Sequence, residues 1–444
     1  MHVITAWSRR LQQRNFAAIS VLFIVPFLAR VSYFTVMVPY YPQWSPREIT
    51  RNHWVEIAQH LERGDGIVLD LLLTWIPVPE PKPTATRGPV PLFILASVIR
   101  IFGDTYYPML GLAYAMSALT CVLLYIIALR CTGSSTTALG AWLLYALFLP
   151  EMRLTTAFST CAEPPFMLLL AIYFWLGLRC ADEGKWHQAA LGGLALGLAC
   201  LCRPVVLFLP VLYVLWLFAW QRQRGLGLAC VFLAVFTAVQ IPWVVRNYRV
   251  FGVPVVTSTL GGLNLYRYNV MIANNQYTYS IPRKYFYPML QQIVRESGIP
   301  LAELNEVQFD DLLKAKAVEI IRAHPLRYAR LCGLRLLWIW YKMDSGRGLY
   351  LVQNLLYYFL AIIGAVVMCR TRNLLLGVLM VHLLYFVAVH VGINTQYRFI
   401  APMLPYVVIL SMIGLEQLSV AAGEKPRRLI RWALPGTASA QPVE

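Results

Sequence analysis

Acidic side chains are gathered in one polar stretch, residues 40–87, of a chain that has only 21 Asp and Glu residues among 444. A carboxylate within hydrogen-bond reach of a hydroxyl group can act as a general base. If the protein is an enzyme that works at a membrane surface, we therefore expect its base in this stretch. The acidic residues that lie there include Glu48, Glu56, Glu62, Asp65 and Asp70.

Arginine residues at the ends of apolar runs form a second group of candidates. Arg203 lies in a short turn between two such runs, Arg246 ends one run and Arg398 begins another. A guanidinium group donates two parallel hydrogen bonds, which suits the oxygens of a phosphate. Convergence of three arginines would indicate phosphate binding, whereas a single one is equally typical of an arginine that extends to lipid headgroups.

Other polar residues occupy similar positions. Glu163 precedes Pro164 at the beginning of an apolar run, where a helix N-terminus stabilises a carboxylate whether or not it contacts a substrate. Asn264 follows Gly261 and Gly262 in a predicted turn, which is only a weak signal for substrate contact. The sequence therefore leaves two roles open for each residue, a structural role and a role in substrate binding.

Motifs of several other chemistries are missing from the sequence. It has no GxSxG, HExxH or GxxxxGK[ST] pattern. His53 and His60 are separated by one i, i+7 step, which is wrong for the i, i+4 pair of a helical zinc site. The cysteines show no metal-ligand spacing. We therefore predict neither a metal nor a cofactor.

The composition is that of a membrane protein. Hydrophobic residues make up 59% of the chain and charged residues 13%, against about half and about a quarter in soluble domains. The formal charge of +17 would raise the question of nucleic acid in a soluble protein. Here the basic residues collect in short loops between apolar runs, and no nucleic-acid-binding module is visible. The sequence therefore predicts a polytopic membrane protein that does not bind nucleic acid.

Apolar runs of about 20 residues predict membrane-spanning helices. Basic clusters near their ends agree with an all-α fold of about ten such helices, with both termini in the cytoplasm. The predicted helices cover residues 16–37, 106–129, 136–150, 164–178, 187–201, 205–220, 226–245, 350–368, 373–391 and 399–418. The predicted divisions are a basic N-terminus (1–15), a first transmembrane helix (16–39), a first outer loop (40–105), a transmembrane core (106–245), a second outer segment (246–348), C-terminal transmembrane helices (349–420) and a cytoplasmic tail (421–444).

Amphipathic patterns occur in both outer segments. Residues 47–64 and 309–341 repeat apolar side chains at helical spacing, and the second run is broken near His324-Pro325. We expect the helices of the second run to lie on the outer headgroups. Residues 89–103 are apolar but short, so we expect them to lie in the interface or to re-enter without spanning the bilayer.

Several short motifs follow one another along most of the chain. They are Trp54-Val-Glu-Ile57-Ala58-Gln-His-Leu61 with Gly64 and Gly66, Thr86-Arg87-Gly-Pro89-Val-Pro91-Leu-Phe93, Glu163 with its apolar helix, Gly193 to Arg203-Pro204, Pro242-Trp243-Val-Val-Arg246-Asn247-Tyr248-Arg249-Val-Phe251-Gly252, Gly261-Gly262-Leu-Asn264-Leu265, and Tyr397-Arg398. In these motifs the chain resembles the GT-C class of polytopic glycosyltransferases. It is most similar to bacterial members of family 39, the protein mannosyltransferase and aminoarabinose transferase group. The run from Trp243 to Gly252 is the most specific motif.

This resemblance implies a transferase that moves a sugar from a polyprenyl-phosphate carrier to a glycan, lipid or protein acceptor on the outer, periplasmic face of a bacterial inner membrane. In the family, an Asp of the first outer loop, four residues before an aromatic residue, is thought to deprotonate the acceptor hydroxyl. From their residue types, we expect Arg203, Arg246 and Arg398 to contact the carrier phosphate. We expect Glu163 to orient the acceptor or the sugar. The remaining substrate-binding candidates are Asn247 and Asn264 on the sugar side, with Arg87 and Tyr397.

The sequence departs from the family at the position of the base. If Trp54 takes the place of the aromatic residue, the position of the family's Asp is Thr50, which cannot act as a base at neutral pH. Three explanations stay open: Glu48 replaces the Asp, Asp65 or Asp70 folds back into the site, or ordinary catalysis has been lost. The last would leave a binder or transporter of the lipid-carrier sugar with the same fold, which is the alternative function.

Overall fold

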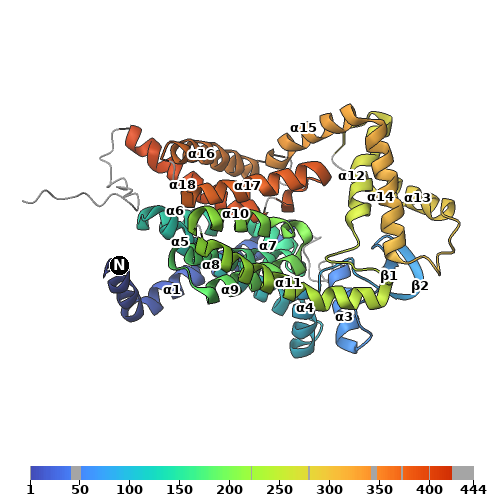
Figure 1. Ribbon diagram of the computed structural model, residues 1–444, viewed down its shortest axis with the longest axis horizontal. Coiled ribbons are helices and arrows are strands. Elements are labelled where there is room, and N and C mark those ends of the chain that lie inside the picture. The colour runs from blue at the N-terminus through green and yellow to red at the C-terminus, as the bar shows by residue number, and fades with distance from the viewer. Residues whose placement is uncertain are drawn as a thin grey trace, which may run out of the picture.

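A bundle of apolar helices and a smaller lobe at one end of it make up the computed structural model of the chain (Figure 1). It describes residues 2–41, 52–221, 223–278, 281–341, 348–371, 374–399 and 401–422. The bundle holds α1 (His2–Met37), α5 (Tyr106–Thr132), α6 (Ser135–Ala146), α7 (Leu149–Ala157), α8 (Glu163–Glu183), α9 (Trp186–Cys202), α10 (Leu209–Gln221), α11 (Gln223–Phe251), α16 (Leu349–Thr371), α17 (Leu374–Ile393) and α18 (Leu404–Ala421). Short 3-10 helices cover Val38–Tyr40, Pro204–Val206, Val270–Asn274, Tyr397–Phe399 and Ala401–Met403.

Each of the ten predicted membrane segments coincides with a helix of the bundle, but the count of ten crossings is not confirmed. Within the described residues, six stretches are long and apolar enough to cross a membrane. The stretches are Ala18–Tyr40, Tyr106–Thr132, Glu163–Glu183, Gly225–Phe251, Leu349–Arg370 and Ala401–Ala421. The helices α9, α10 and α17 are apolar but shorter, and α6 has only 12 residues. The protein is therefore a multi-pass, helical membrane protein.

Two glycines set the tightest crossing in the bundle, between α16 and α18. A Cβ atom added to Gly364 would lie 2.0 Å from the backbone oxygen of Leu410, and one added to Gly414 would lie 2.0 Å from that of Leu360. Only glycine allows two backbones to approach so closely. Small residues bring membrane helices together in this way because lipid gives no hydrophobic driving force for helix association.

The first outer loop begins its described part with α3 (His53–Arg63), which the sequence predicted as an amphipathic helix. The Asn52 side chain caps its N-terminus by accepting hydrogen bonds from the backbone N–H groups of Trp54 and Val55. The apolar face of α3 packs on α4 (Pro89–Phe102), the short apolar helix predicted at 89–103. Gly64 ends α3 in the left-handed conformation.

The lobe joins the two outer segments around a hydrophobic core of its own. The first segment supplies an antiparallel hairpin, and the second supplies three helices, which meet around Leu72, Phe286 and Phe309. These elements are β1 (Val68–Leu72), β2 (Ile76–Pro83), α12 (Gly261–Asn269), α13 (Arg283–Glu296) and α14 (Glu306–Ala323). The hairpin is a small departure from the all-α prediction.

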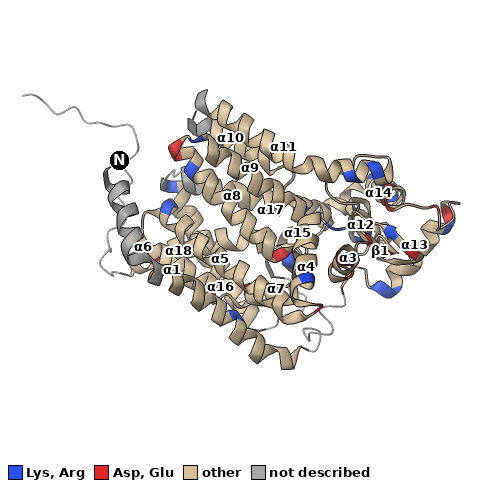
Figure 2. Cartoon of the chain, turned by 90° about the horizontal axis from the view of Figure 1, so that it is seen from below, with Lys and Arg blue, Asp and Glu red and all other residues tan. Residues whose placement is uncertain are grey.

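The break predicted near His324-Pro325 is present, because α14 ends at Ala323 and α15 (Pro325–Tyr341) begins at the proline. We expected the apolar face of α14 to lie on the lipid headgroups, but the structure buries it inside the lobe. Phe309 and Leu313 are buried in the core of the lobe. Figure 2 shows that Lys, Arg, Asp and Glu lie mainly on the lobe and at the helix ends, while the helices of the bundle are mostly uncharged along their length.

Candidate functional site

An ion pair joins the beginning of α8 to the end of α9. The Nη1 atom of Arg203 donates to Oε1 of Glu163 at 3.4 Å, and their side chains are 13% and 8% exposed. Glu163 is the first residue of α8, and Arg203 directly follows the last residue of α9. Burial lowers the pKa of Arg203, and the Glu163 carboxylate opposes that shift. The two predicted residues are therefore in contact.

The ring of Phe399 brings a second arginine to this pair. The guanidinium carbon of Arg203 lies 5.0 Å from the ring centroid of Phe399, and that of Arg398 lies 5.2 Å from it. His390 of α17 stacks on the same ring with its centroid 4.6 Å away and an interplanar angle of 3°. Cations are attracted to the face of an aromatic ring, so Phe399 holds both arginines near Glu163.

Arg87 completes the group, which we call the arginine cluster: Arg87, Arg203 and Arg398. Its guanidinium carbon lies 5.2 Å from the ring centroid of Trp54 on α3. Burial, and to a smaller extent the positive charge of Arg398, lower the pKa of Arg87 to about 10, while Cys161 and Glu163 act against that shift. The three arginines and Glu163 are therefore close enough to influence one another.

Gly88 allows Arg87 to reach this place. A Cβ atom added to Gly88 would lie 1.9 Å from the backbone oxygen of Leu201, in the last turn of α9. The chain between β2 and α4 thus rests directly on the end of α9, next to Arg203. The Thr86-Arg87-Gly-Pro89 motif has a physical reason here, because no other residue fits at its third position.

Two members of the arginine cluster have hydrogen-bond donors without a partner. Within the described part of the chain, the Nε atoms of Arg87 and Arg398 are buried and have no hydrogen-bond partner. Buried polar groups are normally paired, and a phosphate offers the oxygens that guanidinium groups bind best. Three arginines against the single carboxylate of Glu163 also leave an excess of positive charge. The arrangement suits a phosphate anion.

Arg246 does not join the cluster, although we predicted it with Arg203 and Arg398. Its guanidinium donates to the backbone oxygens of Thr84 and Ile67, at 2.9 and 3.0 Å, and to Oδ1 of Asn247 at 2.9 Å. The side-chain amide of Asn247 donates in turn to the backbone oxygen of Val255. Both side chains are therefore engaged in fastening the ends of the hairpin and the loop after α11.

The remaining predicted residues are not brought to the cluster by any described contact. Asn264 lies half-buried in α12, in the lobe. Asp65 and Asp70 both face His60, at 2.9 and 3.8 Å, and both are about half exposed. Glu48 and Thr50, and the side chain of Tyr397, lie outside the described residues.

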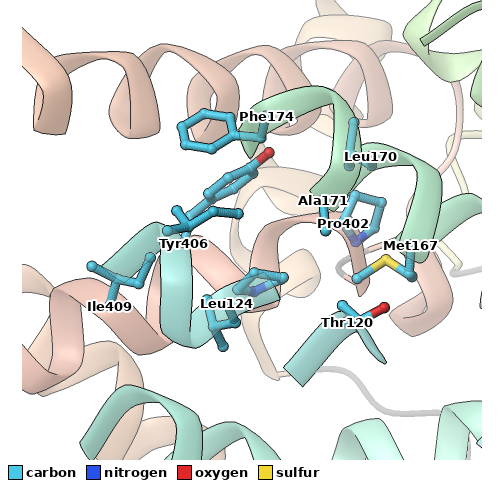
Figure 3. A pocket seen from close by; sticks show the side chains of 11 residues that line it. Thr120, Leu124, Met167, Leu170, Ala171, Phe174, Pro402, Tyr406 and Ile409 are labelled. Carbon is cyan, nitrogen blue, oxygen red and sulfur yellow. The ribbon is translucent and has the colours of Figure 1, made fainter. Parts of the chain in front are cut away.

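Narrow cavities lead from Glu163 into the bundle. One, of about 20 Å³, is lined by Glu163, Glu151 and Thr155, among other residues. It shares Thr120 and Met167 with a second cavity of about 20 Å³ between α5, α8 and α18, whose other lining side chains are mostly apolar (Figure 3). Each has room for about one water molecule. Among the described residues, no group of three His, Cys, Asp or Glu side chains could hold a metal ion.

Three features of the site were missed from the sequence. Phe399 and His390 gave no signal because their role depends on how α17 and the following turn pack. The buried pair of Arg30 and Glu151 could have been found, since a charged residue inside a membrane segment indicates function by default. Arg30 lies in the middle of the first apolar run.

Comparisons with known proteins agree with the predicted class. Residues 83–245, which include Arg87, Glu163 and Arg203, match the family model of dolichyl-phosphate-mannose-protein mannosyltransferases. The fold is similar to that of the oligosaccharyltransferase AglB from Archaeoglobus fulgidus, solved with an inhibitory peptide and a dolichol-phosphate, at a TM-score of 0.53 and 12% identity. That match covers 90% of this chain and 51% of the AglB chain, so the protein spans about half the length of AglB.

A second solved structure with some similarity is that of ArnT from Cupriavidus metallidurans bound to undecaprenyl phosphate. It matches at 15% identity and a TM-score of 0.34, over 83% of this chain and 74% of the ArnT chain. The search of curated proteins gave no match. The fold shared with AglB, together with the family-model match over residues 83–245, shows a multi-pass helical membrane protein with a GT-C-like fold, as the sequence predicted.

Proposed function

We propose that the protein is a glycosyltransferase that moves a sugar from a polyprenyl-phosphate carrier to a glycan, lipid or protein acceptor. The observation that carries this proposal is the arginine cluster, with its unpaired buried Nε donors beside Glu163. The GT-C fold supports it. AglB, a protein of this fold, was solved with a dolichol-phosphate, which has the same chemistry as the proposed carrier.

The proposed reaction displaces the carrier phosphate from the anomeric carbon. A carboxylate removes the proton of the acceptor hydroxyl, the oxygen attacks the anomeric carbon, and the bond from that carbon to the phosphate oxygen breaks. Negative charge grows on the leaving phosphate, where Arg87, Arg203 and Arg398 stabilise it. Preorganised donors of this kind contribute about 10²–10³-fold each to a rate.

Two carboxylates share the remaining roles in this proposal. Glu163 is placed to orient the sugar or the acceptor, because its carboxylate lies against Arg203 and faces a cavity. Glu48 is the proposed base, on the ground of its nearness in sequence to Thr50, where the family has Asp. We further propose that the lobe faces the periplasm of a bacterial cell, with both termini in the cytoplasm, from the distribution of basic residues between the predicted helices.

The test is turnover of labelled polyprenyl-phosphate sugars by the purified protein in lipid nanodiscs. We expect Glu48→Gln and Glu163→Gln to lower kcat, by about 10²-fold or more for the base. Arg100→Gln is the matched control, because Arg100 is an exposed arginine on α4 with no described contact to the cluster. Full activity of Glu48→Gln would remove Glu48 as the base.

A binder or transporter of the lipid-carrier sugar is the second candidate. It is favoured by one observation, the Thr50 that replaces the family's Asp. Such a protein would bind the carrier phosphate through the same arginines and transfer nothing. Binding of polyprenyl phosphate by wild type without turnover of any donor would favour this candidate over the transferase.

A further inference from the structure

A fully buried ion pair lies inside the bundle, away from the lobe. Arg30, in the C-terminal third of α1, is 0% exposed, and its Nη2 atom lies 2.5 Å from Oε2 of Glu151 at the beginning of α7. Its Nε atom donates to the Ser117 hydroxyl of α5 at 2.7 Å, and Nη1 donates to the backbone oxygen of Pro26 at 2.9 Å. Three helices are therefore tied together through one guanidinium group.

Glu151 is equally well paired. Its Oε1 atom accepts hydrogen bonds from the hydroxyls of Ser117 and Thr155, both at 2.6 Å. Burying an ion pair costs desolvation that its attraction does not reliably offset, and apolar residues of similar volume often give equal or greater stability. Stability alone therefore does not account for this pair. In a membrane protein such a pair indicates function by default.

The pair is connected to the site through the segment that joins α7 to α8. Glu151 and Thr155 line the same narrow cavity as Glu163. Between them along the chain, the Thr160 hydroxyl accepts a hydrogen bond of 2.6 Å from Asn52, the residue that caps α3. The segment that Glu151 anchors thus bears both Glu163 and a contact to the helix that carries Trp54, the partner of Arg87.

We propose that Arg30 and Glu151 form a positioning pair for Glu163, which fixes the α7–α8 segment and sets the charge balance of the cavity that Glu163 faces. This inference rests on the proposed function of the arginine cluster. It concerns residues that do not touch the substrate, so their effect is transmitted through Glu163.

The two charges act on Glu163 in opposite directions. When Arg30 and Glu151 are both present, the effects of their charges on Glu163 largely cancel. Glu151→Gln leaves the Arg30 cation unbalanced in the cavity, so activity should persist to lower pH. Arg30→Gln leaves the Glu151 anion unbalanced, so activity should be lost at a higher pH. The charged and titratable groups that surround this region are Arg30 of α1, Arg87 before α4, Tyr114 and Cys121 of α5, Tyr145 of α6, Glu151 of α7, Cys161 before α8, Cys202 and Arg203 at the end of α9, and Arg398.

The experiment measures the pH dependence of kcat and of polyprenyl-phosphate binding for Arg30→Gln, Glu151→Gln and the double variant in nanodiscs. We expect kcat to fall by about 10–10²-fold in each single variant, since small displacements of catalytic groups have effects of that size. Carrier affinity at neutral pH should change by less than about threefold. The acidic limbs should move in opposite directions, and the double variant should lie between them.

Glu416→Gln is the matched control, because Glu416 accepts a hydrogen bond of 2.6 Å from Thr137 between α18 and α6 and does not line the Glu163 cavity. Equal shifts in both single variants, or losses that only follow the melting temperature, would overturn the positioning role. If wild type binds carrier but transfers no sugar, the proposed function fails, and opposite shifts in the pH dependence of binding would still support the pair. Absence of both binding and turnover would contradict both proposals.

Discussion

At the scale of single residues, two members of the arginine cluster differ from Arg246 in having donors without partners. Within the described structure, Arg246 donates its hydrogen bonds to the backbone of nearby loops and to Asn247, whereas Arg87 and Arg398 keep buried Nε donors without hydrogen-bond partners. An arginine whose hydrogen-bond donors are all paired within the protein stabilises the fold. An arginine with unpaired buried donors is suited to bind a ligand. This difference separates the two kinds of arginine, which the sequence presents alike.

Variants of Arg203 test whether phosphate binding needs the planar pair of donors of its guanidinium group. A Lys side chain keeps the charge but loses the planar pair of donors, so we expect Arg203→Lys to weaken polyprenyl-phosphate binding by about 10-fold. Arg203→Gln removes the charge as well, and should weaken binding by about 10²-fold, given that a charged hydrogen bond contributes about 1.5–3 kcal/mol. Titration of nanodisc-embedded protein with polyprenyl phosphate measures both. Equal affinities for wild type and Arg203→Gln would exclude Arg203 from the phosphate site.

A substitution of Gly88 tests the close contact between α9 and the loop that joins β2 to α4. In Gly88→Ala the new Cβ would meet the backbone oxygen of Leu201, so the loop must shift, and overpacking of this kind costs about 1–3 kcal/mol. We expect a lower melting temperature and weaker carrier binding, because Arg87 moves with the loop. Gly111→Ala in α5 is the control, since nothing lies within 4 Å of its added Cβ. A Gly88→Ala protein as stable and active as Gly111→Ala would contradict the contact.

At the scale of elements, the lobe depends on a buried carboxylate between its two halves. Glu306, at the beginning of α14, accepts hydrogen bonds from the backbone N–H of Ala85 and from the hydroxyls of Thr84 and Thr259, the latter two at 2.9 and 2.8 Å. These partners come from both outer segments. Burial raises the pKa of Glu306 to about 7, and the hydrogen bonds only partly oppose that shift.

The raised pKa of Glu306 predicts a pH dependence of stability. Protonation is favoured more in the folded protein than in the unfolded chain, so this contribution is fully present below about pH 4.5 and is lost as the pH rises through about 7. Wild type should therefore lose stability between pH 5 and pH 8, by at most about 3 kcal/mol. In Glu306→Gln this loss should be absent. Melting curves of both proteins across that range would show it, and parallel curves would refute it.

The elements differ in how far the sequence could reveal them. The bundle helices were predicted because lipid requires long apolar runs, and the end of α14 because Pro325 cannot continue a helix. The β2 strand was missed, since Pro77, Pro79, Pro81 and Pro83 argue against a strand in sequence. The contact of Arg87 with the cluster could not be predicted, because it depends on how a loop crosses the end of α9.

At the scale of the whole molecule, the lobe and the opposite end of the bundle should lie on different sides of the membrane. Glu303 is exposed in the lobe, and Lys185 is exposed between α8 and α9. With the proposed orientation, a membrane-impermeant maleimide should label Glu303→Cys in cells with a permeable outer membrane and an intact inner one. It should label Lys185→Cys only after the inner membrane is opened. The unsubstituted protein gives the background from the native cysteines, and the reverse pattern would invert the topology.

The lobe is shared between two distant parts of the chain, and this has a consequence for biogenesis. The hairpin ends at Pro83, but α14, which completes the core around it, begins only at Glu306. At translation rates of about 5–20 residues per second, the hairpin waits roughly 10–45 s for its packing partners. During that interval the side chains of Leu72 and Ile76 have no finished core to enter. We therefore expect newly synthesised chains to be open to chaperones and proteases at the hairpin until the ribosome has made the second half of the lobe.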